Sequence, residues 1–194
     1  MDRSLLEVDH EECMAIGETS DVGPSGLMFE WDEARAALVR AETSVYQFAY
    51  EPAGGRYDAL LSVALRYCAY GLLVLQDFPW NETTRAALED LEKWRLNEVI
   101  GTEWPGTKTL KEARLHVLKF DSGLCAALQR LTRRLYQWEQ PNLPEDLCLF
   151  RASGEPWLVS IAHEADGWLL LRPSEAKAVV ETLRPLSLIR SDLR

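Results

Sequence analysis

The sequence lacks the residue patterns that identify the commonest small enzymes. It contains no HExxH, GxSxG or GxGxxG motif and no Walker phosphate-binding loop, so the usual signatures of zinc proteases, serine hydrolases, dinucleotide enzymes and nucleotide hydrolases are missing. Its four cysteines are far apart, without a CxxC pair or a histidine at zinc-finger spacing. We therefore expect reduced cysteines in the cytoplasm, no metal site and no cofactor.

Long apolar runs and a basic N-terminal segment are also missing. The most apolar stretch, residues 69–75, is far shorter than the roughly 20 residues that a membrane-spanning helix needs. The chain starts with acidic residues where a secretion signal requires positive charge and then a long apolar segment. We therefore expect neither export nor a membrane partner.

Positive charge is scarce at the N-terminal end of the chain. The formal net charge is -10, and residues 1–33 hold ten acidic side chains against a single base, Arg3. The remaining residues, 34–194, hold 21 acidic and 20 basic side chains and are close to neutral. Such a body has no positive field to attract nucleic acid, so we expect no nucleic-acid partner.

A small Gly/Pro/Ser cluster at residues 22–26 separates the acidic end from the apolar remainder. An acidic terminal segment of this kind is usually solvated or frayed. The sequence therefore predicts an acidic, partly disordered arm over residues 1–26. It predicts one folded domain over residues 27–194, a length that can bury a sizeable core without metal or disulfides.

Apolar residues recur along this domain with helical and strand periods in turn. Helical spacing and capping residues predict helices at residues 32–42, 57–66, 81–99, 121–138 and 174–183. Strands are predicted at residues 45–50 and 112–120, and a turn at residues 102–107. The apolar run within residues 67–76 suits a buried strand or a buried helix equally well.

The C-terminal third is expected to form a three-stranded antiparallel meander. A turn at residues 153–154 would place Cys148 opposite Val159. The same register would place Phe150 opposite Trp157. Since the strands are apolar on both faces, they should be central and covered on both sides.

A second turn is expected at residues 166–167, which would place His163 opposite Leu170. One face of the meander would then carry Cys148, Phe150, Trp157, Val159, Ile161, His163, Trp168 and Leu170. Together these patterns predict a single α+β domain with a central, mainly antiparallel sheet and packed helices.

His163 is the best candidate for acid-base chemistry, because histidine titrates near neutral pH and a carboxylate can orient it. Adjacent side chains on a strand point to opposite faces, so Glu164 should face away from His163. Asp166, three residues further on, is the better partner. A hydrogen-bonded histidine at the end of a core strand is the simpler interpretation. Cys148 would lie too far along the strand to form a nucleophilic pair with His163.

Other candidate binding residues are aromatic or basic. Tryptophan is a good contact residue when it lines an exposed pocket, and arginines at helical spacing suit phosphate or a partner's acidic groups. The candidates are Trp104, Trp157, Trp168, Arg172 and a strip on the 121–138 helix formed by Arg130, Arg133 and Arg134.

Three segments resemble a family of bacterial proteins of unknown function. They are Glu-Trp-Pro-Gly-Thr at residues 103–107, Leu-Pro-Glu-Asp-Leu-Cys-Leu-Phe-Arg at residues 143–151 and Trp-Leu-Val-Ser-Ile-Ala-His-Glu at residues 157–164. The resemblance covers roughly residues 104–171. It implies a bacterial, cytoplasmic protein and carries over no catalytic residue.

We interpret the chain as a non-catalytic cytoplasmic protein that binds another protein, as a regulator or as a toxin-neutralising partner. This hypothesis follows from the missing catalytic signatures, the acidic arm and the tryptophans beside turns. The alternative is a small enzyme or ligand-binding protein that uses His163 with Asp166 as an acid-base pair. A further alternative is a homodimer formed through an exposed sheet edge or aromatic patch.

Overall fold

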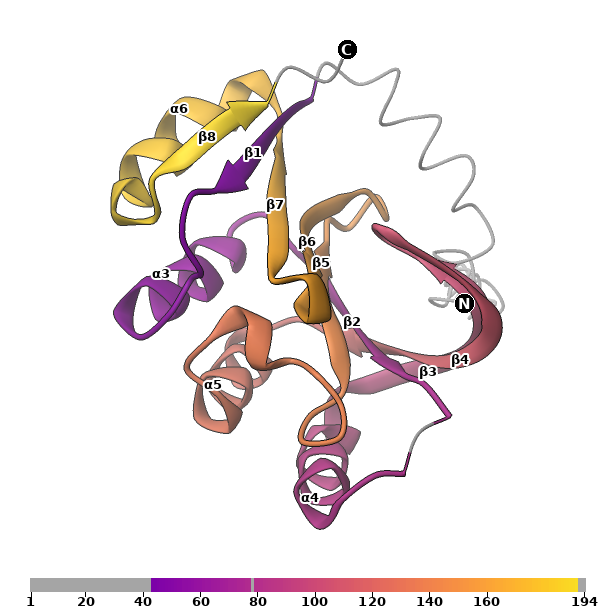
Figure 1. Cartoon of the computed structure of the whole chain (residues 1–194). Helices are drawn as coiled ribbons and strands as arrows, with labels where there is room; N and C mark the ends of the chain where they lie inside the picture. The colour runs from indigo at the N-terminus through magenta and orange to yellow at the C-terminus, as the bar shows by residue number, and fades with distance from the viewer. Residues whose placement is uncertain (1–42, 78, 192–194) are drawn as a thin grey trace, which may run out of the picture.

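The computed structural model describes residues 43–77 and 79–191 (Figure 1). The acidic arm predicted at residues 1–26 and the helix predicted at residues 32–42 lie outside these residues. The strands are β1 (Ser44–Phe48), β2 (Tyr70–Leu75), β3 (Arg95–Trp104), β4 (Thr107–Lys119), β5 (Glu145–Phe150), β6 (Pro156–Ile161), β7 (Asp166–Leu171) and β8 (Leu188–Ser191). The α-helices are α3 (Gly55–Ala64), α4 (Glu82–Leu91), α5 (Ser122–Leu131) and α6 (Pro173–Thr182).

The described strands form one eight-stranded sheet in the order β3-β4-β2-β5-β6-β7-β1-β8. Each neighbouring pair of strands is antiparallel. This architecture confirms the predicted single α+β domain with a central antiparallel sheet. None of the helices in the described ranges is long and apolar enough to cross a membrane.

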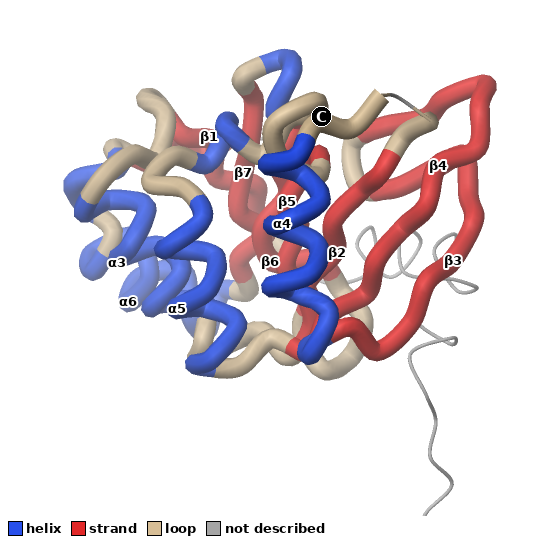
Figure 2. The backbone as a smooth tube through the Cα atoms, turned by 90° about the horizontal axis from the view of Figure 1, so that it is seen from below, coloured by secondary structure: helices blue, strands red, loops and turns tan. Residues whose placement is uncertain are grey.

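All four described α-helices pack against one face of the sheet (Figures 1 and 2). The apolar side chains between them are almost fully buried, and each such side chain contributes roughly 1.5–3 kcal/mol by leaving water. The sheet contributes Leu73, Leu147, Leu149, Trp157, Leu158, Leu169 and Leu171, and the helices contribute Leu60, Leu61, Leu124, Leu128 and Val179. We call this the helical face.

The predicted helices at 81–99 and 121–138 both end earlier in the structure. Asn81 caps α4, and its side chain accepts a hydrogen bond of 2.9 Å from the Thr84 amide. The helix stops at Leu91, and a 3-10 turn, η1 (Glu92–Trp94), leads directly into β3. The second half of the predicted helix is therefore a strand, and this prediction was wrong.

The early end of α5 has a local cause at Thr132. Asp121 caps the helix at its predicted start, accepting hydrogen bonds of 2.9 and 3.0 Å from the Gly123 and Leu124 amides. At the other end, the Thr132 hydroxyl donates to Gln137 Oε1 at 2.6 Å and accepts from the Arg134 amide at 3.2 Å. Side-chain bonds of this kind compete with the helical backbone ladder. The chain becomes extended at Thr132, and a 3-10 turn, η2 (Leu135–Gln137), follows.

Residues 67–76 contain a strand, β2, rather than a helix. In the meander, the first predicted register is present at Leu149, which pairs with Leu158. A bulge then shifts the ladder, so that Phe150 pairs with Pro156 instead of Trp157. Trp157 consequently lies on the helical face and not on the predicted one.

The second predicted turn is wrong. The chain turns at η3 (Ala162–Glu164) and at Ala165, which has the left-handed φ of 52°. As a result Ile161 pairs with Asp166, and Val159 pairs with Trp168. His163 therefore lies in the turn and has no strand partner, because β6 ends two residues before it.

The opposite face of the sheet is covered differently. Within the described ranges no α-helix packs on it, and the longest strands, β3 and β4, form a hairpin that curves over it (Figure 1). Its apolar side chains are Val45, Leu72, Val74, Trp104, Ala113, Leu115, Val117, Cys148, Phe150, Val159 and Leu170. We call this the open face.

Candidate functional site

The tip of the β3–β4 hairpin is fixed to the open face by a buried hydrogen bond. Pro105 and Gly106 form the turn predicted from the sequence, with Gly106 at a φ of 82°. Trp104, just before the turn, is 1% exposed, and its indole Nε1 donates to Asp146 Oδ2 at 2.8 Å. The bond joins the far end of β3 to the start of β5.

Asp146 is fully buried and has both oxygens occupied. Its Oδ1 accepts a 2.8 Å hydrogen bond from the Ala162 amide, so the same carboxylate also holds the turn after β6. Burial raises the pKa of Asp146, and the hydrogen bonds from Ala162 and Trp104 oppose this rise. A buried carboxylate that accepts a hydrogen bond at each oxygen from two distant parts of the chain acts as an anchor between them.

Gly106 allows the tip to approach the sheet closely. A side-chain Cβ at this position would lie 2.9 Å from Ile161 Cδ1 and 3.0 Å from Trp168 Cη2. A larger residue would require the ends of the Ile161 and Trp168 side chains to shift, and it would also be strained at the φ of 82°. Glycine at this position thus lets the tip pack directly against β6 and β7.

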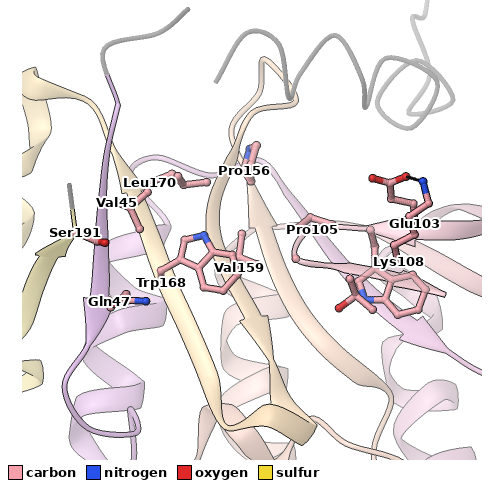
Figure 3. A pocket seen from close by; sticks show the side chains of 13 residues that line it. Val45, Gln47, Glu103, Pro105, Lys108, Pro156, Val159, Trp168, Leu170 and Ser191 are labelled. Carbon is pink, nitrogen blue, oxygen red and sulfur yellow. Dashed lines mark ion pairs between the residues drawn. The ribbon is translucent and has the colours of Figure 1, made fainter. Parts of the chain in front are cut away.

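A pocket of about 470 Å³ lies between the hairpin tip and the strands β1, β6, β7 and β8 (Figure 3). Volumes of roughly 300–1,000 Å³ are typical of ligand pockets. Its lining residues are Val45, Gln47, Glu103, Trp104, Pro105, Gly106, Thr107, Lys108, Pro156, Val159, Trp168, Leu170 and Ser191. Figure 3 shows the Trp168 indole extending across the pocket floor toward Val159.

The register of the sheet explains the apolar floor. Val45 on β1 pairs with Leu170 on β7, and Gln47 pairs with Trp168. Cross-strand partners share one face of a sheet, so these four side chains are on the same side as the hairpin tip. The ionisable lining residues are Glu103 and Lys108, which form an ion pair of 3.4 Å at the rim.

One polar atom in the pocket wall has no partner. The Thr107 hydroxyl is buried and makes no hydrogen bond within the described part of the chain. A buried polar group without a partner costs about 1–3 kcal/mol. A bound molecule with a polar atom in reach of Thr107 Oγ1 would remove this cost.

The structure does not join His163 to Asp166. Among the described residues no hydrogen bond or ion pair connects them, and Asp166 Oδ1 accepts from the Gly167 amide at 2.7 Å. His163 is exposed in the turn, and its Nε2 lies 3.9 Å from Glu164 Oε1. The strand argument that separated His163 from Glu164 fails because both residues belong to η3, where adjacent side chains need not alternate.

His163 lies instead near Glu145 and Asp146, close enough for electrostatic interaction with both carboxyl groups. Glu145 is half-buried, and Gln76 Nε2 donates to its Oε2 at 2.5 Å. Burial is the main influence and raises the pKa of Glu145. This small polar group is separate from the pocket lining.

The three arginines of the predicted strip do not form one helical surface. Arg130 is in α5, but Arg133 and Arg134 follow the end of the helix. Each holds a carboxylate from another part of the chain, and the pairs are Arg130 with Asp90, Arg133 with Asp58 at 2.6 Å, and Arg134 with Glu51. These ion pairs link α5 and the segment after it to α4, to α3 and to the loop after β1.

The remaining candidates separate into two groups. Trp168 lines the pocket, and Trp104 lines it while anchoring the tip. Trp157 is 0% exposed in the core of the helical face, where it stacks on Tyr67 with ring centroids 5.7 Å apart. Arg172 forms an ion pair with Glu155. Trp157 and Arg172, both predicted as candidate binding residues, are thus outside the pocket.

Cys148 is completely buried on the open face, and burial raises the pKa of its thiol. It is therefore a core residue with little thiolate character. Residues 43–77 and 79–191 contain no group of three or more His, Cys, Asp or Glu side chains arranged to hold a metal ion.

Sequence reasoning missed the anchor and part of the pocket. Nothing in the local sequence around Asp146 indicates a bond to Trp104, 42 residues away. Gln47 and Val45 were recognised only as strand residues. The Trp-Pro-Gly turn at residues 104–106 was the one local indication of the anchor, because it places a tryptophan directly beside a turn.

Comparisons with protein-family models, with curated proteins and with solved structures gave no match for this chain. The resemblance to a bacterial family therefore remains a prediction.

Proposed function

We propose that this chain is a non-catalytic cytoplasmic protein that acts by binding another protein, as a regulator or a toxin-neutralising partner, and that it does so through the pocket on the open face. The observation that carries the proposal is the nature of the lining. The floor is apolar, and the ionisable groups at the rim, Glu103 and Lys108, neutralise each other. Such a surface suits recognition and offers no acid-base pair.

The occupant that fits best is an aromatic side chain with a polar atom, such as tyrosine or tryptophan, presented by the partner. Trp168 offers a partly exposed ring for stacking, and aromatic pairs contribute about 0.5–1.5 kcal/mol beyond their buried area. The unpartnered Thr107 hydroxyl offers a hydrogen bond to the polar atom. Aromatic anchors in such pockets frequently dominate binding energy.

Site-specific photo-crosslinking tests the proposal. A photoreactive amino acid at Gln47, an exposed residue in the lining, should capture a partner protein in the native cell. The same amino acid at Lys177, exposed on α6 at the helical face, should not capture that protein. Capture of the same set of proteins from both positions would contradict the proposal.

A second variant tests occupancy of the pocket. Gln47→Trp should fill the space without removing a core side chain, and we expect it to weaken binding of the captured partner by at least about tenfold, or about 1.4 kcal/mol. Lys177→Trp adds the same side chain elsewhere and should leave the affinity unchanged. Equal affinity for wild type and Gln47→Trp would show that the partner does not use the pocket.

A small-molecule ligand is a second candidate, favoured by the pocket volume and by the free hydroxyl of Thr107. Under this hypothesis an aromatic metabolite would quench or shift the fluorescence of Trp168 and raise the melting temperature. Both effects should be lost in Gln47→Trp. A ligand that stabilises wild type and Gln47→Trp equally would bind elsewhere.

A further inference from the structure

The chain enters the described fold at the border of the pocket. Thr43 is the first described residue, and β1 begins at Ser44. Val45 lines the pocket and pairs with Ser191 on β8, which is another lining residue. Figure 3 shows these two side chains on the same side of the pocket. The residues that precede Thr43 are therefore attached directly beside it.

The attached segment is long enough to reach the pocket. Residues 27–31 read Leu-Met-Phe-Glu-Trp, and Trp31 is 12 residues before Thr43. The residues between them span about 16 Å as the helix predicted from the sequence and up to about 40 Å when extended. The tether can thus bring Trp31 over a pocket that starts two residues after Thr43.

The chemistry of Trp31 matches the pocket lining. The floor offers the partly exposed ring of Trp168, and the wall offers the buried hydroxyl of Thr107, which makes no hydrogen bond within the described residues. A tryptophan side chain provides an aromatic ring and a single N–H donor, and a threonine hydroxyl can accept from it. Residues 1–42 contain no other tryptophan and no tyrosine. Trp31 is therefore the side chain of this segment that can satisfy both groups.

The charges beside Trp31 suit the rim of the pocket. Trp31 lies among three acidic residues, Glu30, Asp32 and Glu33. Lys108 at the rim has a side chain that is 77% exposed and lies 3.4 Å from Glu103. Exposed ion pairs of this kind contribute little to stability, so Lys108 can interact with the acidic residues of the segment at little cost.

We propose that Trp31 occupies the pocket on the open face in the free protein, with its ring against Trp168 and its indole N–H donating to Thr107 Oγ1. A short tether holds a ligand at an effective concentration on the order of millimolar. The regulatory consequence rests on the proposed function. A partner must displace Trp31 before its own aromatic side chain enters, so the segment lowers the affinity of the pocket for every partner.

Two other occupants fit the pocket less well. Leu193, which follows Ser191, has neither a ring nor a polar side-chain atom. Trp31 of a second copy has the same chemistry, but it is present only at the bulk protein concentration. At micromolar protein the tethered Trp31 has the advantage, because its effective concentration is far higher.

Photo-crosslinking of the purified full-length protein tests the occupant. A photoreactive amino acid at Gln47, an exposed lining residue, should crosslink to residues 27–33 of the same chain, as mass spectrometry of the monomeric product can show. The same amino acid at Lys177, on α6 at the helical face, should not reach residues 27–33. A crosslink from Gln47 to residues 192–194 instead, to a second copy, or to no part of residues 27–33 would overturn the proposal.

Competition with a small probe tests the same contact in a second way. N-acetyltryptophanamide, titrated against the isotope-labelled full-length protein and followed by NMR at the Trp168 indole N–H, should bind Trp31→Ala at least about threefold more tightly than wild type. Leu5→Ala, which removes an apolar side chain elsewhere in the same acidic segment, should bind the probe as wild type does. Equal binding to wild type and Trp31→Ala, or no binding to Trp31→Ala, would overturn the proposal.

These measurements contain no partner protein, so they separate this proposal from the proposed function. A crosslink between Gln47 and residues 27–33, with no partner captured in the cell, would support the internal occupant and reject the proposed function. Capture of a partner through Gln47 without the internal crosslink would have the opposite meaning.

Discussion

The two faces of the sheet are closed in different ways. Four helices cover the helical face, where side chains such as Trp157 and Leu158 have no exposed surface. On the open face, within the described ranges, the end of the β3–β4 hairpin provides cover and leaves a pocket beside Trp168 (Figure 3). Complete packing stabilises the helical face and leaves no exposed surface on Trp157, whereas cover by the hairpin tip leaves a pocket on the open face.

The two faces also depend on different forces. The helical face is held by many apolar contacts that each contribute a little. The hairpin tip depends on one carboxylate, Asp146, that accepts hydrogen bonds from Trp104 and Ala162. The stability of the helical face should therefore depend on many residues, whereas the position of the hairpin tip should depend mainly on Asp146.

The largest expected effect is on the helical face. Trp157→Ala should lower the free energy of unfolding by about 3–5 kcal/mol, because a fully buried ring is replaced by a cavity. Trp168→Ala, which removes a partly exposed ring from the pocket, should lower it by about half as much or less. Urea denaturation followed by circular dichroism measures both. Equal losses would mean that the two faces are packed alike.

The second effect concerns the anchor. Asp146→Ala should lower the free energy of unfolding by about 2–4 kcal/mol, since it leaves the Trp104 indole N–H and the Ala162 amide without acceptors. Asp146→Asn keeps one acceptor oxygen and should lose less. If both variants were as stable as wild type, the carboxylate would not be holding the tip.

The pH dependence of the free energy of unfolding tests the role of Asp146 in a second way. Burial raises the pKa of Asp146 in the folded state above its value in the unfolded chain. Below about pH 3 both states hold the proton. As the pH rises, the unfolded state loses it first, so the contribution of Asp146 to the free energy of unfolding falls until the folded pKa is passed.

Asp146→Asn removes this titration and is the matched control. The free energy of unfolding of wild type minus that of Asp146→Asn should decrease between about pH 4 and neutral pH. Parallel urea titrations of the two proteins give this difference. A difference that increases with pH would indicate a lowered pKa and contradict the account.

The smallest effect comes from the pocket wall. Thr107→Val replaces a buried hydroxyl without a partner and should raise the free energy of unfolding by up to about 1 kcal/mol. Thr109→Val removes a hydroxyl that donates to the Lys111 carbonyl at 2.7 Å, so it should lower stability by about 1 kcal/mol. Thermal unfolding of the pair shows whether the signs are opposite.

Local patterns predicted much of the fold. Capping residues marked the starts of the helices predicted from residues 81 and 121, where Asn81 and Asp121 cap α4 and α5. The hairpin turn at Pro105 and Gly106 followed from the conformational preferences of its residues. The apolar residues of the meander indicated strands covered on both sides, and the structure confirms this for β5, where Leu149 on the helical face and Cys148 on the open face are both fully buried. These features depend on residues that are close in the sequence, so they could be predicted from it.

Features that depend on distant residues were missed. Helical spacing continues past Leu91, so no local signal marked the start of β3. The dipeptide at residues 166–167 matches a tight turn, yet the chain turns earlier, where Asp146 binds the Ala162 amide. That bond joins residues 16 apart and displaced His163 from its predicted strand.

The most direct test of the account is hydrogen exchange of the Trp104 indole N–H, observed by NMR and assigned with Trp104→Phe. We expect this proton to exchange slowly in wild type and rapidly in Asp146→Ala, while the amides of β2 and β5 stay protected in both. Rapid exchange of the Trp104 indole in wild type would contradict the claim that the hairpin tip is anchored on the open face.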